Sequence, residues 1–361
     1  MKKERLMFFM EGRLVMARKA SGAPHSVAPL LLALVCLTSA ACFELEDPAL
    51  TPDGEPDAWT VDPTDDGLEA IVEAACPAEY PELDMVPSGS QDEAWRWLNC
   101  YRNLAQVELA SLTPGCATAT DRHAAYMDET AEYSMLETQA SAVNYSGYDA
   151  LERLGAAGDE IDLATHSVYE MMVRTGNGDA VEPRRAVDAW INTVYHRSPL
   201  LRPLIDGVGI GFGAQFGDMV AVGPWDTVDH GGQLLTAIYP APGQAGVPTT
   251  YHSDAEVPDP APGVNQVGSP ISVTFQAGHW HDSDNHFDIQ LDPEGCSVTP
   301  RGGEPADLIL LDPENDDTLW STVVLLPAEP MEPGVTYDVE VAATIAGTPW
   351  SKGWTFTTDG S

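Results

Sequence analysis

The stretch AWINTVYHRSPLLRPLIDGVGIGFG, residues 189–213, decides how the rest of the chain is interpreted. Its first part places Trp190, Thr193, His196 and Arg197 at fixed spacing near the end of a predicted helix, and a Leu-Leu-x-Pro sequence follows. Its last part alternates glycine with apolar residues, which is the two-residue period of a strand. The stretch therefore predicts a helix that leads, through a polar turn, into a β-strand.

The residues around this stretch continue the mixture of helices and strands. Apolar residues recur at helical spacing over 92–109 and 117–135. Residues 184–195 form a third predicted helix, and Pro183 suits its first turn. Residues 208–212 and 218–222 are predicted strands on either side of a glycine-rich turn. The region is thus of mixed α+β character.

Four motifs in this region occur in the order found in a known family. They are Leu98-Asn99-x-x-Arg102, His123-Ala124, VYEMM at 168–172, and the stretch from Trp190 to Gly211 with its His-Arg pair. Together they resemble the CAP superfamily of cysteine-rich secretory, antigen 5 and pathogenesis-related proteins, in its bacterial form. The resemblance implies a CAP domain over residues 88–228, folded as an α-β-α sandwich.

The same resemblance implies a cleft with two His and two Glu that can bind zinc, a metal that accepts imidazole and carboxylate ligands. His196 takes the place of the second His and Glu170 that of the first Glu, whereas Thr193 replaces the second Glu. The first His is missing, because residues 136–141 read LETQAS. His166 lies four residues before Glu170 and would share its face if that turn is helical. The expected cleft residues are therefore His196, Glu170, His166, Thr193 and Trp190.

Two interpretations of the cleft remain open. In one, zinc is the cofactor and His196, Glu170 and His166 hold it. In the other, His196 lines the cleft and bonds a neighbouring carboxylate, with Glu170 as a buried acid paired with it. His123 is expected to be a packed or capping side chain. A second histidine-rich cluster, at 279–286, is expected to be either a polar loop or a site for a divalent transition metal.

The C-terminal part of the chain has a different composition. Glycine, proline and β-branched residues dominate from 229 onward, and five short strands are predicted at 271–275, 308–311, 322–326, 337–342 and 354–357. The sequences MEPGVTYDVEV and GWTFTT resemble bacterial immunoglobulin-like modules. The overall expectation is a CAP α-β-α sandwich followed by an all-β immunoglobulin-like sandwich at residues 237–358.

The N-terminal residues predict export. Residues 1–41 combine basic residues, an apolar core too short to span a membrane, and small residues before Cys42, as in a signal peptide. These small residues resemble a bacterial lipoprotein site with Cys42 as the lipidated residue, and simple secretion is the alternative. Residues 42–80 are acidic and proline-containing, and we expect a disordered tether there.

Four cysteines remain after Cys36 and Cys42 are assigned to the export signal. In an oxidising compartment they favour disulfide formation. Cys100–Cys116 is the preferred bridge, although Cys76 competes for either partner, and connectivity does not follow from sequence.

The charge of the chain limits its partners. A formal net charge of −39 disfavours nucleic acid, whose binding requires basic residues. Contact with a membrane is expected through the lipid anchor only. The leading hypothesis is an extracellular, surface-anchored CAP-domain lipoprotein of the cell envelope that binds a small-molecule, lipid-like or envelope ligand rather than turning one over. The alternatives are an extracellular hydrolase that uses His196 and Glu170, and a structural adhesion or spacer protein.

Overall fold

The computed structural model describes residues 6–7, 66–163, 165–175, 180–224, 233–276 and 288–360. These residues all belong to one compact unit. Four predicted features lie outside the described residues: the expected signal peptide except for residues 6–7, the expected lipidation site Cys42, the first part of the expected tether, and the histidine-rich cluster at 279–286. No helix within the described ranges is both long and apolar enough to cross a bilayer.

The N-terminal region combines helices with one antiparallel sheet of order β1-β2-β4-β3. The strands are β1 (Leu6–Met7), β2 (His166–Thr175), β3 (Gly207–Phe212) and β4 (Phe216–Pro224). The helices are α1 (Asp66–Ala74), α2 (Gly89–Leu104), α3 (Pro114–Thr130), α4 (Ala150–Ala156), α5 (Pro183–Ile191) and α6 (Arg197–Leu200).

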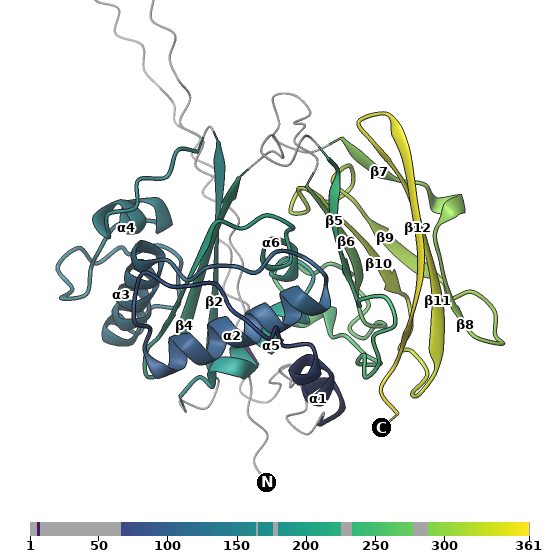
Figure 1. Ribbon diagram of the computed structural model, residues 1–361, viewed down its shortest axis with the longest axis horizontal. Helices are drawn as coiled ribbons and strands as arrows, with labels where there is room; N and C mark the ends of the chain where they lie inside the picture. The colour runs from purple at the N-terminus through teal and green to yellow at the C-terminus, as the bar shows by residue number, and fades with distance from the viewer. Residues whose placement is uncertain are drawn as a thin grey trace, which may run out of the picture. The chain divides into compact units, whose positions relative to one another are not determined.

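The glycine-alternating run forms β3, and its glycines allow helix α3 to approach the strand closely. A Cβ atom added to Gly209 or Gly211 would lie 2.1 or 2.3 Å from backbone atoms of α3. Val208 and Ile210 point to the opposite face and share a core with residues of α2 and α5. The sheet therefore lies between α3 and α4 on one face and α2 and α5 on the other, which confirms the mixed three-layer organisation (Figure 1).

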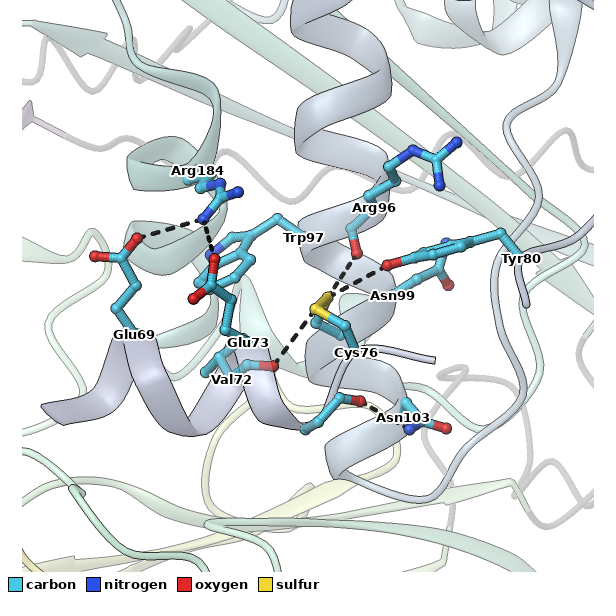
Figure 2. The surroundings of a disulfide bond; sticks show 12 residues. Glu69, Val72, Glu73, Cys76, Tyr80, Arg96, Trp97, Asn99, Asn103 and Arg184 are labelled. Carbon is cyan, nitrogen blue, oxygen red and sulfur yellow. Dashed lines mark hydrogen bonds and ion pairs between the residues drawn. A yellow bond between two sulfur atoms is a disulfide. The ribbon is translucent and has the colours of Figure 1, made fainter. Parts of the chain in front are cut away.

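The predicted disordered tether is wrong for residues 66–80. Helix α1 forms within it because Leu68 and Val72 lie one turn apart on the helix and are buried in the core. Figure 2 shows α1 beside α2, where the Arg184 guanidinium lies 3.3 Å from carboxylates of both Glu69 and Glu73. Burial of this apolar face offsets the acidic composition that suggested disorder.

The expected Cys100–Cys116 bridge is also wrong. Cys100 is bonded to Cys76, with a Cα–Cα distance of 4.0 Å, and the bridge joins the end of α1 to α2 (Figure 2). Cys116 is a buried free thiol on α3, and burial raises its pKa to about 11. Helix α1, which the acidic composition did not predict, brings Cys76 close to Cys100.

The C-terminal region is built from two antiparallel sheets, and the five predicted strands are confirmed. One sheet has the order β5-β6-β10-β9 and the other β12-β11-β7, with β8 also paired to β11. Three strands were missed because they are short or lie next to proline-rich segments: β5, β7 and β8. The bounds are β5 (Leu235–Tyr239), β6 (Ile271–Gln276), β7 (Ile289–Leu291), β8 (Ser297–Pro300), β9 (Leu308–Leu311), β10 (Thr322–Pro327), β11 (Thr336–Ile345) and β12 (Thr348–Thr357).

The first of these sheets is buried on both faces. Along β10, Val323 and Leu325 belong to the core between the two sheets, whereas Val324 and Leu326 belong to the core of the N-terminal region. Strands β5 and β9 divide their side chains in the same way. This explains the continuous apolar sequence TVVLL, since a strand covered on both sides has no polar face. The sandwich therefore packs against the N-terminal domain through a shared apolar core.

Candidate functional site

Five charged or ionisable side chains gather between the central sheet and helices α3 and α4. Alternation along β2 turns Glu170 toward α3, on the same face as Val168 and Met172. Asp218 lies on the neighbouring strand β4, on the face that its neighbours Val220 and Val222 share with α3. The remaining members are His123 of α3, Glu137 of the following loop and Arg153 of α4; we call these five residues the Glu170 cluster.

The acidic end of the Glu170 cluster is held by a dense set of bonds. His123 Nδ1 lies 3.1 Å from Glu137 Oε1, and Glu137 Oε2 accepts the amide of Ser146 at 2.6 Å. Arg153 donates to Glu170 Oε1, and its Nε lies 4.0 Å from Glu137. Burial disfavours ionisation of Glu137, but His123, the Ser146 amide and Arg153 outweigh it, so its pKa is lowered. Glu137 is therefore a fixed carboxylate that orients His123.

Asp218 is the unusual member of this cluster. It is fully buried, and burial together with the neighbouring Glu170 charge raises its pKa well above the ordinary value, with Arg153 opposing. Among the described residues, neither of its oxygens accepts a hydrogen bond, Arg153 Nη1 has no acceptor, and His123 Nε2 has no partner. Buried polar atoms are rarely left without partners, so four such atoms in one cluster mark a candidate binding site.

His196 lies in a different environment, at the contact with the C-terminal region. Its Nδ1 faces Thr193 Oγ1 at 3.0 Å and Glu256 Oε1 at 3.2 Å, and both side chains of the His196–Glu256 pair are fully buried. Trp190 lies on α5, as predicted, and its Nε1 donates to the carbonyl of Met172 at 3.3 Å. His196 therefore bonds a carboxylate, but one supplied by the segment between β5 and β6 of the sandwich.

Glu256 organises this contact. It accepts the backbone amides of Val194 and Tyr195, each at 2.8 Å, and the hydroxyl of Tyr251. Burial disfavours its ionised form, but the bonds from His196, Tyr251 and the Val194 amide prevail and lower its pKa. A charged carboxylate is thus fixed at the start of the turn that carries the His-Arg pair.

Arg197, the second residue of that pair, also joins the two regions. Its Nε donates to the Ile191 carbonyl at 2.5 Å and its Nη1 to the Pro270 carbonyl at 2.6 Å. The guanidinium lies 4.6 Å from the ring centroid of Tyr239. The His-Arg pair therefore connects the N-terminal domain to the sandwich.

The structure does not join the residues expected to form the cleft. Glu170 faces α3, whereas Val194 and Tyr195, next to His196, share a core with Met171 on the other side of the sheet. The segment holding His166 is strand β2, not a helical turn, so His166 lies about 13 Å along the strand from Glu170. Its Nε2 instead contacts Asp206 at 2.9 Å. The zinc ligand set His196, Glu170 and His166 therefore does not fit this structure.

Sequence reasoning missed three members of the Glu170 cluster and Glu256. Glu137 stands in the LETQAS segment, where only the missing His was sought. Asp218 is an acid within the apolar strand sequence FGDMVAVG, and such a burial is costly enough to be a usable signal. Arg153 and Glu256 carry no local signal, because their partners are distant in the sequence.

The comparisons with known proteins found similarity in the N-terminal region. Residues 95–220 match the model of the CAP family, the cysteine-rich secretory protein family. A solved structure that matches is an extracellular protein containing an SCP domain from Bacillus anthracis, with 17% identity and a TM-score of 0.30. That match covers 37% of this chain and 40% of the other. No curated protein matches the chain.

The matched segment begins within α2, ends within β4 and contains all five residues of the Glu170 cluster. The family match therefore supports the CAP resemblance for the three-layer region. The sandwich lies outside the matched residues.

Proposed function

We propose that this chain is an extracellular CAP-domain protein that binds a ligand at the Glu170 cluster and does not catalyse a reaction. The observation that carries the proposal is the set of buried polar atoms without partners at His123, Arg153 and Asp218. Polar groups arranged in this way stabilise a ligand that supplies the missing partners.

The hydrolase alternative receives no support from the geometry. It requires His196 as a base and Glu170 as the group that orients it, but His196 pairs with Glu256, and Glu170 pairs with Arg153. A spacer function has no specific observation in its favour either, because a spacer does not require a buried charged cluster.

The ligand class and the anchor belong to this proposal. The CAP domain binds a small, lipid-like or cell-envelope component, and Cys42 carries a lipid that holds the protein at the bacterial envelope. The sandwich is an immunoglobulin-like module that packs on the CAP domain and presents it in a fixed orientation. The acidic net charge of −39 keeps the protein from binding the anionic lipid surface itself.

Co-sedimentation with isolated bacterial envelopes, with lipid vesicles and with cell-wall sacculi tests this function. We expect the wild-type protein to bind at least one of these preparations, and Glu170→Gln to bind it about tenfold more weakly, the loss expected for one charge-assisted hydrogen bond. Glu160→Gln, a change at an exposed glutamate, is the matched control and should bind as the wild type does. Equal binding by all three proteins would show that the Glu170 cluster is not the ligand site.

A further inference from the structure

Three buried side chains of the Glu170 cluster place ligand atoms around one point. A ring nitrogen of His123 and a carboxylate oxygen from each of Glu170 and Asp218 lie within 4.8 Å of one another. Ligand atoms about 2.1 Å from a tetrahedral zinc ion are about 3.4 Å apart, so side-chain shifts of about 1 Å bring these atoms to one ion. We propose that His123, Glu170 and Asp218 bind one divalent transition-metal ion.

Glu137 prepares His123 for this role. Its carboxylate faces His123 Nδ1 at 3.1 Å and is itself fixed by the amides of Ser146 and Gly147. With the proton on Nδ1, the lone pair of Nε2 is directed away from Glu137, and Nε2 has no partner among the described residues. Metal-binding histidines typically donate their second N–H to a carboxylate in this way.

The charge of the cluster suits a divalent ion. With its three carboxylates ionised, as metal ligands are, and His123 neutral, the cluster has a formal charge of −2, and each of its side chains is at most 7% exposed. Uncompensated buried charge is costly, and a divalent cation reduces the sum to zero. Arg153 bonds Glu170 through Oε1, which leaves Oε2 for the ion. The guanidinium therefore positions the ligand without occupying the site.

This ligand set differs from the one that the family resemblance implies. It keeps only Glu170, and it takes its histidine from α3 and its second carboxylate from β4. One imidazole with two carboxylates suits zinc or a neighbouring first-row metal, with the remaining coordination position open to a ligand atom. The inference rests on the proposed function, because the ion occupies the same site and supplies one of its contacts.

Metal content and affinity test the inference. The full-length protein is loaded with Zn²⁺, freed of excess metal by gel filtration and analysed by mass spectrometry of the elements, and affinity is measured against a chromophoric chelator. We expect about one zinc per chain in the wild type and in the exposed-site control Glu160→Gln. Asp218→Asn and Glu170→Gln should lose this zinc, and Glu137→Gln should bind it about 10- to 100-fold more weakly.

Two controls make each result decisive. A triple change of His279, His281 and His286 to Asn removes the other histidine-rich segment, and zinc lost with these residues but kept in Asp218→Asn overturns the proposal. If an Asp218 or Glu170 variant does not fold, the unfolding midpoint of the wild type provides the test. Zinc should raise this midpoint, and a chelator should reverse the rise. A midpoint unchanged by zinc overturns the proposal. If zinc does not bind but envelope binding persists, this inference fails and the proposed function stands.

Discussion

The Glu256→Gln variant tests whether the His196 region connects the two domains. Glu256 accepts four hydrogen bonds, two on each oxygen, from two backbone amides, His196 and Tyr251. Glutamine keeps one accepting oxygen and places an NH2 group against two donors. Bonds to a charged group contribute about 1.5–3 kcal/mol each, and removing one member of a buried pair costs about 3–5 kcal/mol.

We therefore expect Glu256→Gln to lower the free energy of unfolding by about 3–5 kcal/mol at neutral pH. That loss is large beside the total of about 5–15 kcal/mol for a typical protein. Urea unfolding followed by tryptophan fluorescence measures it, with the exposed Glu329→Gln as the matched control. We also expect a single transition in the wild type, because the two domains share an apolar core.

The pH dependence of this difference gives a second readout. The folded-state pKa of Glu256 lies below its unfolded value, so its stabilisation is fully present above the unfolded value of 4.5 and is lost as pH falls through the folded pKa. The gap between wild type and variant should therefore narrow in acid. A loss below about 1 kcal/mol at neutral pH, equal to that of the control, would refute the reasoning about this contact.

Three further substitutions test the disulfide and the buried carboxyl of Asp188. Cys76→Ser opens a disulfide loop with a sequence separation of 24 and should lower the free energy of unfolding by about 3 kcal/mol. Cys116→Ser should leave the disulfide intact. Peptide mapping without reduction that links Cys100 to Cys116 would contradict this pairing. Burial raises the pKa of Asp188 to about 6, from an ordinary 3.8, so its contribution to stability is greatest below pH 3.8 and falls as pH rises through 6. The amide side-chain oxygen in Asp188→Asn can still accept hydrogen bonds from Trp97 and Tyr101. The variant should therefore raise the urea midpoint at pH 7 but not at pH 3.5. An equal effect at both pH values would contradict the raised pKa of Asp188.

Much of the fold could be predicted from periodicity. The glycines of β3, the apolar positions of α2 and α3, and five strands of the sandwich carry local patterns that the structure confirms. Helix α1 could not be predicted in this way, because its acidic composition suggested disorder although Leu68 and Val72 are buried. The wrong disulfide prediction has the same cause, since α1 brings Cys76 close to Cys100.

The site was harder to predict than the fold. Trp190, Thr193 and His196 are neighbours in sequence and in space, as expected, but Glu256 covers His196 from a segment 60 residues away. Glu170 lies on the other face of the sheet, where its partners come from α3, α4 and β4. Sequence spacing identifies residues on one helix or strand, but it does not show which face of a sheet a distant side chain reaches.

The central claim is that ligand binding and domain contact belong to different residues, the Glu170 cluster and His196. The most direct measurement compares the envelope-binding isotherm and the unfolding midpoint of His196→Gln with those of the wild type. We expect unchanged affinity and an unfolding free energy lower by about 1–3 kcal/mol, because the change disturbs a buried contact of the domain interface. Lost binding with an unchanged unfolding midpoint would contradict the claim and return His196 to the ligand site.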